Sequence, residues 1–133
     1  MSRYCLDTSA YSQLRRGEPQ VTDLIDTAEW IGVPAVTLGE LHAGFACGRR
    51  RRENEQTLED FLADPVVVTL AVDHSVARIF GEVIVDLRRA GTPVPTNDAW
   101  IAAQTIREGA TVLTFDRHFR KIPRVSALVL TVD

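Results

Sequence analysis

The sequence predicts an α/β fold in which a parallel sheet is flanked by helices, and two observations support this prediction. Short apolar runs that suit strands alternate along the chain with longer segments of helical periodicity. One of these runs, VVVTL at 66–70, is apolar without a break, which is typical of a strand covered on both faces. The 133 residues contain no linker, internal repeat or low-complexity tract, so we expect a single domain over 1–133.

The first half of the chain is expected to begin with a short buried strand at Arg3–Leu6. Gly17 ends the helix that follows from about Ser9 to Arg16. Pro34 favours an edge strand or a strand start, because proline cannot donate a hydrogen bond to a sheet. The other elements expected here are a helix from Pro19 to about Trp30, a strand at Val33–Val36, a helix opened by a Thr37–Glu40 capping box and running to about Cys47, and a helix with Leu58, Phe61 and Leu62 on its buried face.

The second half is expected to alternate strands and helices regularly. After the apolar run that follows Pro65, Asp73 can cap a long helix that Gly91 ends. The next helix covers Asp98–Glu108 and is closed by Gly109, and the last two strands are expected at Thr111–Phe115 and Ala127–Val132. Sites in parallel sheets form outside the carboxyl ends of the strands, so residues that directly follow a strand are candidates for function.

Four acidic residues stand where an apolar run or a proline-rich turn gives way to a helix: Asp7, Glu40, Asp98 and Asp116. Four carboxylates at one edge of a sheet would raise one another's pKa unless a cation neutralised them. Oxygen ligands without histidine or cysteine suit Mg²⁺ or Mn²⁺ rather than zinc. These four residues are therefore the candidate catalytic and metal-binding groups.

Each of these acids also has a simpler explanation as a helix cap. Asp7 could cap the first helix, and Glu40 could be the partner of Thr37 in a capping box. Asp98 would complement the dipole of a first turn, and Asp116 could cap a short following segment. Capping and metal binding are compatible, because a helix N-terminus favours the ionised carboxylate that a metal needs.

The chemistry that such a metal site favours is phosphoryl transfer, in which a metal can activate water and neutralise the charge of the scissile phosphate. The chain has no GxxxxGK[ST] or GxGxxG element for nucleotide binding, and its serines form no convincing catalytic triad. His42, His74 and His118 show no metal-ligand spacing, so we expect surface or packing roles for them.

Four segments match, in order, the motifs of a known family. They are YCLDTSAYSQL at 4–14, VTLGELHAG at 36–44, VPTNDAWIAAQTI at 94–106 and VLTFDRHFRKI at 112–122. On these segments, spread over essentially the whole chain, the sequence resembles a PIN-domain ribonuclease, specifically the VapC-type toxin of bacterial and archaeal toxin–antitoxin pairs. The resemblance implies a PIN-like α/β/α sandwich with a central parallel sheet.

The resemblance also implies roles for particular residues. It makes the four acids a Mg²⁺ site, and it gives supporting positions to Thr8, Ser9, Asn97 and Thr114. It implies metal-dependent endonuclease action on RNA, inhibition of translation, neutralisation by a VapB-like antitoxin, and homodimers that assemble with the antitoxin. Our mechanistic hypothesis is in-line attack by metal-activated water, which leaves 5′-phosphate and 3′-hydroxyl ends.

Basic residues gather in clusters although the net charge is −3. Fourteen of the fifteen are arginines, and the planar guanidinium group suits phosphate. The alternative for GRRRREN at 48–54 is a solvated helix start or linker. The candidate RNA-binding residues are Arg49, Arg50, Arg51, Arg52, Arg117 and Arg120.

Two other classes of function fit parts of the sequence. A haloacid-dehalogenase-type phosphatase needs a second acid where Ser9 stands, and a receiver-like domain needs a lysine earlier than Lys121. A non-catalytic module that binds RNA or an acidic partner would use the arginines alone. The N-terminus lacks the apolar core of a signal peptide, and Cys5 and Cys47 have no CxxC spacing, so we expect a cytoplasmic protein.

Overall fold

The computed structural model describes residues 2–132, in which five strands form one parallel sheet. The strand order is β3-β2-β1-β4-β5, so β1 is central and the chain order reverses between β1 and β4. In open parallel sheets, such a reversal opens a crevice at the carboxyl ends of the two strands. The strands are β1 (Arg3–Leu6), β2 (Trp30–Pro34), β3 (Val67–Leu70), β4 (Thr111–Thr114) and β5 (Ser126–Val129).

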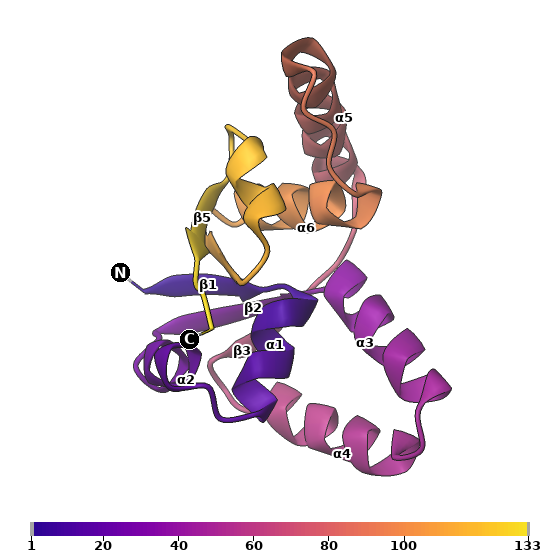
Figure 1. Cartoon of the computed structure of the whole chain (residues 1–133), viewed down its shortest axis with the longest axis vertical. Helices are drawn as coiled ribbons and strands as arrows, with labels where there is room; N and C mark the ends of the chain where they lie inside the picture. Colours follow the sequence, from indigo (N-terminus) through magenta and orange to yellow (C-terminus); the bar gives the residue numbers. More distant parts are fainter. Residues whose placement is uncertain (1, 133) are drawn as a thin grey trace.

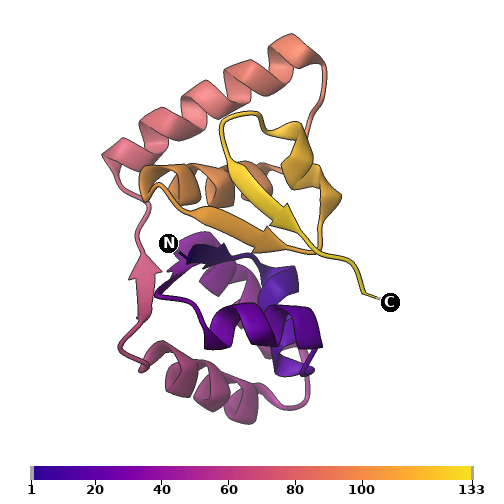
Figure 2. The same cartoon turned by 90° about the vertical axis from the view of Figure 1, so that its left-hand side faces the viewer.

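Helices cover both faces of this sheet, as Figures 1 and 2 show. Leu6 and Leu113 pack with α1 and α2 on one face, whereas Val112 packs with α5 and α6 on the other. The predicted α/β/α sandwich is therefore confirmed. The helices are α1 (Thr8–Arg15), α2 (Pro19–Asp26), α3 (Ala35–Cys47), α4 (Arg51–Leu62), α5 (His74–Ala90), α6 (Thr96–Arg107) and the 3₁₀ helix η1 (Arg117–Lys121).

Helices α3 and α4 form a hairpin that extends from the sheet beside α1 (Figure 1). A small apolar cluster of Tyr11, Leu41 and Leu58 joins these three helices. The amino end of α3 lies at the sheet, and its carboxyl end lies at the far end of the hairpin. No helix within residues 2–132 has the length and apolar character that crossing a membrane requires.

The segment between β1 and α3 differs from the prediction. Helix α2 ends at Asp26 rather than near Trp30, and β2 occupies Trp30–Pro34 rather than Val33–Val36. The reason is tertiary packing: Trp30 lies against a buried cluster that contains Cys5, and the Arg3 guanidinium covers its ring at 4.2 Å. Gly32 makes room for this ring, because a Cβ there would lie 2.6 Å from the Cη2 atom of Trp30.

Pro34 lies at neither predicted position, because it ends an interior strand and directly precedes α3. Its φ of −59° suits the turn from strand to helix. The predicted capping box is also wrong, since α3 begins at Ala35 and Thr37 lies inside its first turn. The Thr37 hydroxyl instead donates to the carbonyl oxygen of Leu6 at 2.9 Å, which ties α3 to the end of β1.

The expectation that the valine run is covered on both faces is wrong. Strand β3 lies at an edge of the sheet, and the Val68 side chain is 40% exposed. An uninterrupted apolar run therefore does not distinguish an edge strand from a central one here. The last strand is shorter than expected, Ser126–Val129, and α6 begins two residues before Asp98.

Candidate active site

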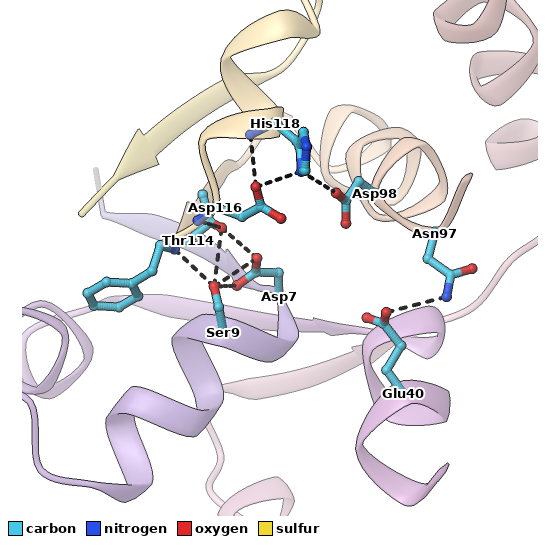
Figure 3. A network of polar contacts seen from close by, with 9 residues as sticks. Asp7, Ser9, Glu40, Asn97, Asp98, Thr114, Asp116 and His118 are labelled. Atoms are coloured by element: carbon cyan, nitrogen blue, oxygen red, sulfur yellow. Dashed lines mark hydrogen bonds and ion pairs between the residues drawn. The ribbon is translucent and has the colours of Figure 1, made fainter. Parts of the chain in front are cut away.

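The four predicted acids surround the carboxyl ends of β1 and β4 (Figure 3). Asp7 directly follows β1, and Asp116 comes two residues after β4. Asp98 lies in the first turn of α6, and Glu40 lies in the second turn of α3. The reversal of chain order between β1 and β4 therefore brings together residues that are more than a hundred positions apart in the sequence.

Asp7 is the buried anchor of the site, with only 5% of its surface exposed. Its carboxylate caps α1 by accepting the Ala10 N–H at 2.9 Å. It also accepts the hydroxyls of Ser9, at 2.8 and 3.0 Å, and of Thr114, at 2.5 Å. Burial raises the pKa of Asp7, and these hydrogen bonds oppose that rise by favouring the ionised form.

Ser9 and Thr114 join the two aspartates that follow the strands. The Thr114 hydroxyl donates to Asp7 and accepts the Asp116 N–H at 2.9 Å. The Ser9 hydroxyl also donates to Asp7, and it accepts the Phe115 N–H at 2.9 Å. The hydroxyls therefore fix the start of α1 against the segment between β4 and η1, and with it the position of Asp7 relative to Asp116.

Asp98, Asp116 and His118 form the most compact group of possible ligands. One atom from each of these side chains lies within 4.8 Å of the other two. The His118 Nδ1 atom is 2.8 Å from Oδ1 of Asp116 and 3.8 Å from Oδ2 of Asp98 (Figure 3). The Oδ2 atom of Asp98 is buried and finds no hydrogen-bond partner among residues 2–132.

The electrostatics of Asp98 connect all four acids. The pKa of Asp98 is raised to about 6, first by burial and then by the negative charges of Asp116, Asp7 and Glu40 in that order. His118 acts in the opposite direction, because its positive form would favour the ionised carboxylate. The four carboxylates are therefore close enough to repel one another at a partly desolvated position.

His118 is a site residue that sequence reasoning missed, because a surface or packing role was expected for it. The Asp116 carboxylate caps η1 by accepting the His118 N–H at 2.9 Å. This local turn also places the His118 imidazole next to the Asp116 carboxylate. An aspartate followed two residues later by a histidine at a short helix start is the signal that could have revealed the contact.

Glu40 lies at the periphery of the site. Its carboxylate accepts the Thr8 hydroxyl at 2.7 Å and the Asn97 side-chain N–H at 3.3 Å. It contributes no atom to the compact group of Asp98, Asp116 and His118. Asn97 is the neighbour of Asp98, so the contact links the start of α6 to α3 on the far side of the acids from η1 (Figure 3).

The donor set fits a divalent cation. Carboxylate oxygens are the ligands that Mg²⁺ and Mn²⁺ prefer, and Mg²⁺ commonly keeps several waters beside one or two carboxylates. The unpartnered Oδ2 atom of Asp98 and the mutual repulsion of the acids are the features that a bound cation would relieve. Asp98 and Asp116 each offer an oxygen within 4.8 Å of the other, and Asp7 and Glu40 add their charges at Asp98.

The predicted arginines divide into two groups. Residues 49–52 are exposed where α3 ends and α4 begins, at the far end of the hairpin from the sheet (Figure 1). Arg51 lies 3.6 Å from Glu55 in its own helix. The structure therefore does not bring this run to the acids, whereas Arg117 and Arg120 lie on η1, beside Asp116.

Comparison with known proteins shows the family of this chain. The PIN domain family model matches residues 4–125. The chain is 35% identical to the plasmid stability protein StbB of Pseudomonas syringae pv. tomato, over 84% of this chain and 86% of that one. It is 31% identical to ribonuclease VapC4 of Mycobacterium tuberculosis, over 77% of this chain and 78% of that one.

Among solved structures, VapBC-5 of Mycobacterium tuberculosis, a member of the VapBC family of toxin-antitoxin systems, superimposes with a TM-score of 0.74. The identity is 28%, and the match covers 99% of this chain and 100% of that chain. The chain therefore belongs to the PIN domain family. Within the family it is of the VapC type, as the four sequence motifs predicted.

Proposed function

We propose that the protein is an endoribonuclease toxin that hydrolyses RNA phosphodiester bonds with the help of Mg²⁺, for which Mn²⁺ can substitute. The observation that carries this proposal is the group of mutually repelling carboxylates around the unpartnered Oδ2 atom of Asp98. The name ribonuclease in the relative VapC4 supports RNA as the substrate class. A divalent cation in this group would lie beside the polyanionic substrate.

The acidic residues would hold the cation, and neighbouring hydroxyl and amide side chains orient them. Asp98 and Asp116 would hold the cation directly, with Asp7 beside them and Glu40 acting from the periphery. Bound Mg²⁺ supplies a water of lowered pKa and neutralises charge on the scissile phosphate. Ser9 and Thr114 orient Asp7 and favour its ionised form, because their hydroxyls donate to its carboxylate. Thr8 and Asn97 orient Glu40 in the same way.

The biological role that we propose is inhibition of translation, held in check by a VapB-like antitoxin. The likeness to VapBC-5, a member of a family of toxin-antitoxin systems, supports such a partner. We expect the protein to form a homodimer and to assemble with the antitoxin into a hetero-oligomer. Co-expression with a cognate VapB-like antitoxin should abolish its toxicity.

The test of the catalytic proposal is cleavage of a panel of structured RNAs with Mg²⁺, with Mn²⁺ and with EDTA. We expect cleavage only with metal, and a loss of at least about a hundredfold in Asp98→Asn and Asp7→Asn, since electrostatic groups at a reacting phosphate have effects of this size. Asp73→Asn is the matched control, because Asp73 caps α5 by accepting the Val76 N–H at 2.9 Å and is not among the four acids.

The products give an independent check of the chemistry. Attack by water should leave 5′-phosphate and 3′-hydroxyl ends and should tolerate a 2′-deoxy substitution at the scissile nucleotide. Cyclic 2′,3′-phosphate ends would contradict the mechanism. Normal cleavage by Asp98→Asn would contradict the proposed metal site.

A further inference from the structure

An open hollow of about 490 Å³ adjoins the acids on the side of η1. This volume lies within the range of roughly 300–1,000 Å³ that is usual for small-ligand sites. Its lining residues are Ser9, Phe115, Asp116, Arg117, His118 and Lys121. Asp116 is one of the four acids, Ser9 donates to Asp7 and His118 contacts Asp116, so a ligand in the hollow would lie beside a phosphate at the acids.

Two cations of the hollow are free to bind an anion. Arg117 and Lys121 are exposed, and neither makes an ion pair or side-chain hydrogen bond with another residue of the described part, 2–132. Arg124, three residues after Lys121, provides the contrast. Its guanidinium is held by Glu82 at 2.6 Å and by Asp86 at 2.5 Å. The positive charge of Arg124 is thus neutralised by α5, whereas that of the hollow is not.

Phe115 gives the hollow an aromatic wall. Its side chain is half-buried and packs at the edge of the apolar cluster that contains Leu6 and Leu113. Its backbone N–H donates to the Ser9 hydroxyl, which fixes the residue beside Asp7. An aromatic side chain that lines a hollow beside free cations is a combination with which proteins bind single-stranded nucleic acid, because every base can stack on an aromatic ring.

We propose that this hollow binds one nucleotide of single-stranded RNA next to the scissile bond. The base stacks on Phe115, and the phosphate of that nucleotide contacts Arg117 and Lys121. This proposal rests on the proposed ribonuclease function and adds the path that the RNA strand takes across the surface. The RNA strand runs from the acids along η1, and not along the arginine run 49–52 at the far end of α3.

The test combines protein variants with altered substrates. A short single-stranded RNA that the wild-type protein cleaves is prepared with one abasic nucleotide at each position around the cleaved bond. Loss of the stacked base should lower kcat/KM about tenfold at one adjacent position, because base–aromatic stacking contributes about 1–3 kcal/mol. Phe115→Leu, which keeps an apolar side chain against the core, should cleave the intact RNA about tenfold more slowly and be insensitive to the abasic nucleotide at that position.

The cations are tested by RNA binding without metal, so that this arm does not depend on cleavage. Arg117→Ala combined with Lys121→Ala should weaken binding and reduce its dependence on salt concentration, because counterion release scales with the phosphates contacted. Arg88→Ala combined with Arg89→Ala is the matched control. These two arginines are exposed at the end of α5, and their removal should leave binding unchanged.

The outcomes separate this proposal from the proposed function. If the wild-type protein cleaves RNA and Phe115→Leu responds to the abasic nucleotides as the wild type does, the hollow is not a nucleotide site and the nuclease remains. Unchanged binding by the Arg117 and Lys121 variant overturns the phosphate contact in the same way. If no RNA is cleaved with any metal, the ribonuclease function itself fails.

Discussion

Asp98 carries an electrostatic strain that should be visible in the stability of the metal-free protein. Its pKa of about 6 lies above the value of 3.8 expected for an unperturbed aspartate, first because of burial and then because of Asp116, Asp7 and Glu40. Between these pH values Asp98 therefore carries a proton in the folded chain but is ionised in the unfolded chain. The resulting penalty is fully present above about pH 6 and disappears below about pH 4.

We therefore expect the free energy of unfolding in EDTA to rise by about 1 kcal/mol from this group as the pH falls from 7 to 5. Asp98→Asn should be more stable than the wild type at pH 7 and should lack this contribution. Urea unfolding of both proteins at the two pH values measures the effect. His118 faces Asp98 and is present in both proteins, so the comparison isolates the contribution of Asp98. Equal stability of the two proteins at pH 7 would show that Asp98 is not strained.

Thr114 offers a second residue-level test, because its buried hydroxyl serves two partners at once. Thr114→Val removes the donor to Asp7 and the acceptor of the Asp116 N–H, and we expect a loss of about 1–3 kcal/mol in the free energy of unfolding. Thr114→Ser keeps the hydroxyl and should recover most of the loss. Thr111→Val in the same strand is the control, since its hydroxyl contact with Ser126 is exposed. Equal losses in Thr111→Val and Thr114→Val would contradict this role.

At the scale of elements, the sequence predicted the helix ends that local signals determine, but not the end that long-range packing determines. Asp73 caps α5 and Gly91 ends it, as the sequence indicates, because both act through the backbone within one turn. The end of α2 and the start of β2 could not be predicted in this way. Trp30 continues a helical pattern in the sequence, but its ring packs beside Cys5, and this contact exists only once β1 and β2 are paired.

Gly81 within α5 and Gly91, which ends this helix, are expected to respond in opposite ways to the same change. Gly91 has a φ of 67°, so alanine there should cost about 1 kcal/mol of stability. Gly81 lies on the exposed side of the same helix, and a Cβ there would meet nothing within 4 Å. Alanine at Gly81 should therefore stabilise the protein by about 0.5–1 kcal/mol. Chemical denaturation of both variants checks the pair, and destabilisation by Gly81→Ala would show that this surface of α5 is not free.

At the scale of the molecule, the site depends on a strand order that the sequence does not reveal. The alternation of strands and helices is the same for many orders, so the sandwich was predictable, but the position of β1 beside β4 was not. The four acids were identified from their places after strands and at helix starts. Their proximity follows only from the folded arrangement, whereas the contact of His118 with Asp116 is local to the start of η1.

The acids come from four separate parts of the fold, so a cation between them should stabilise the whole molecule. Asp7 joins β1 to α1 on one face of the sheet, and Asp98 belongs to α6 on the other. A ligand that binds only the folded state adds about 2.7 kcal/mol at a concentration one hundred times its dissociation constant. Mg²⁺ should therefore raise the Tm of the wild-type protein in a saturable way.

The variants decide whether this rise comes from the four acids. Asp98→Asn should lose most of the increase in Tm, whereas Asp73→Asn, which changes an acid on a different helix cap, should keep it. The increase should also shrink below about pH 6, because a proton on Asp98 then competes with the cation. Thermal scans of the three proteins with and without Mg²⁺ measure these effects. An equal rise in the wild type and in Asp98→Asn would mean that Mg²⁺ acts on the general surface charge, and the acids would then have to be held together by the fold alone.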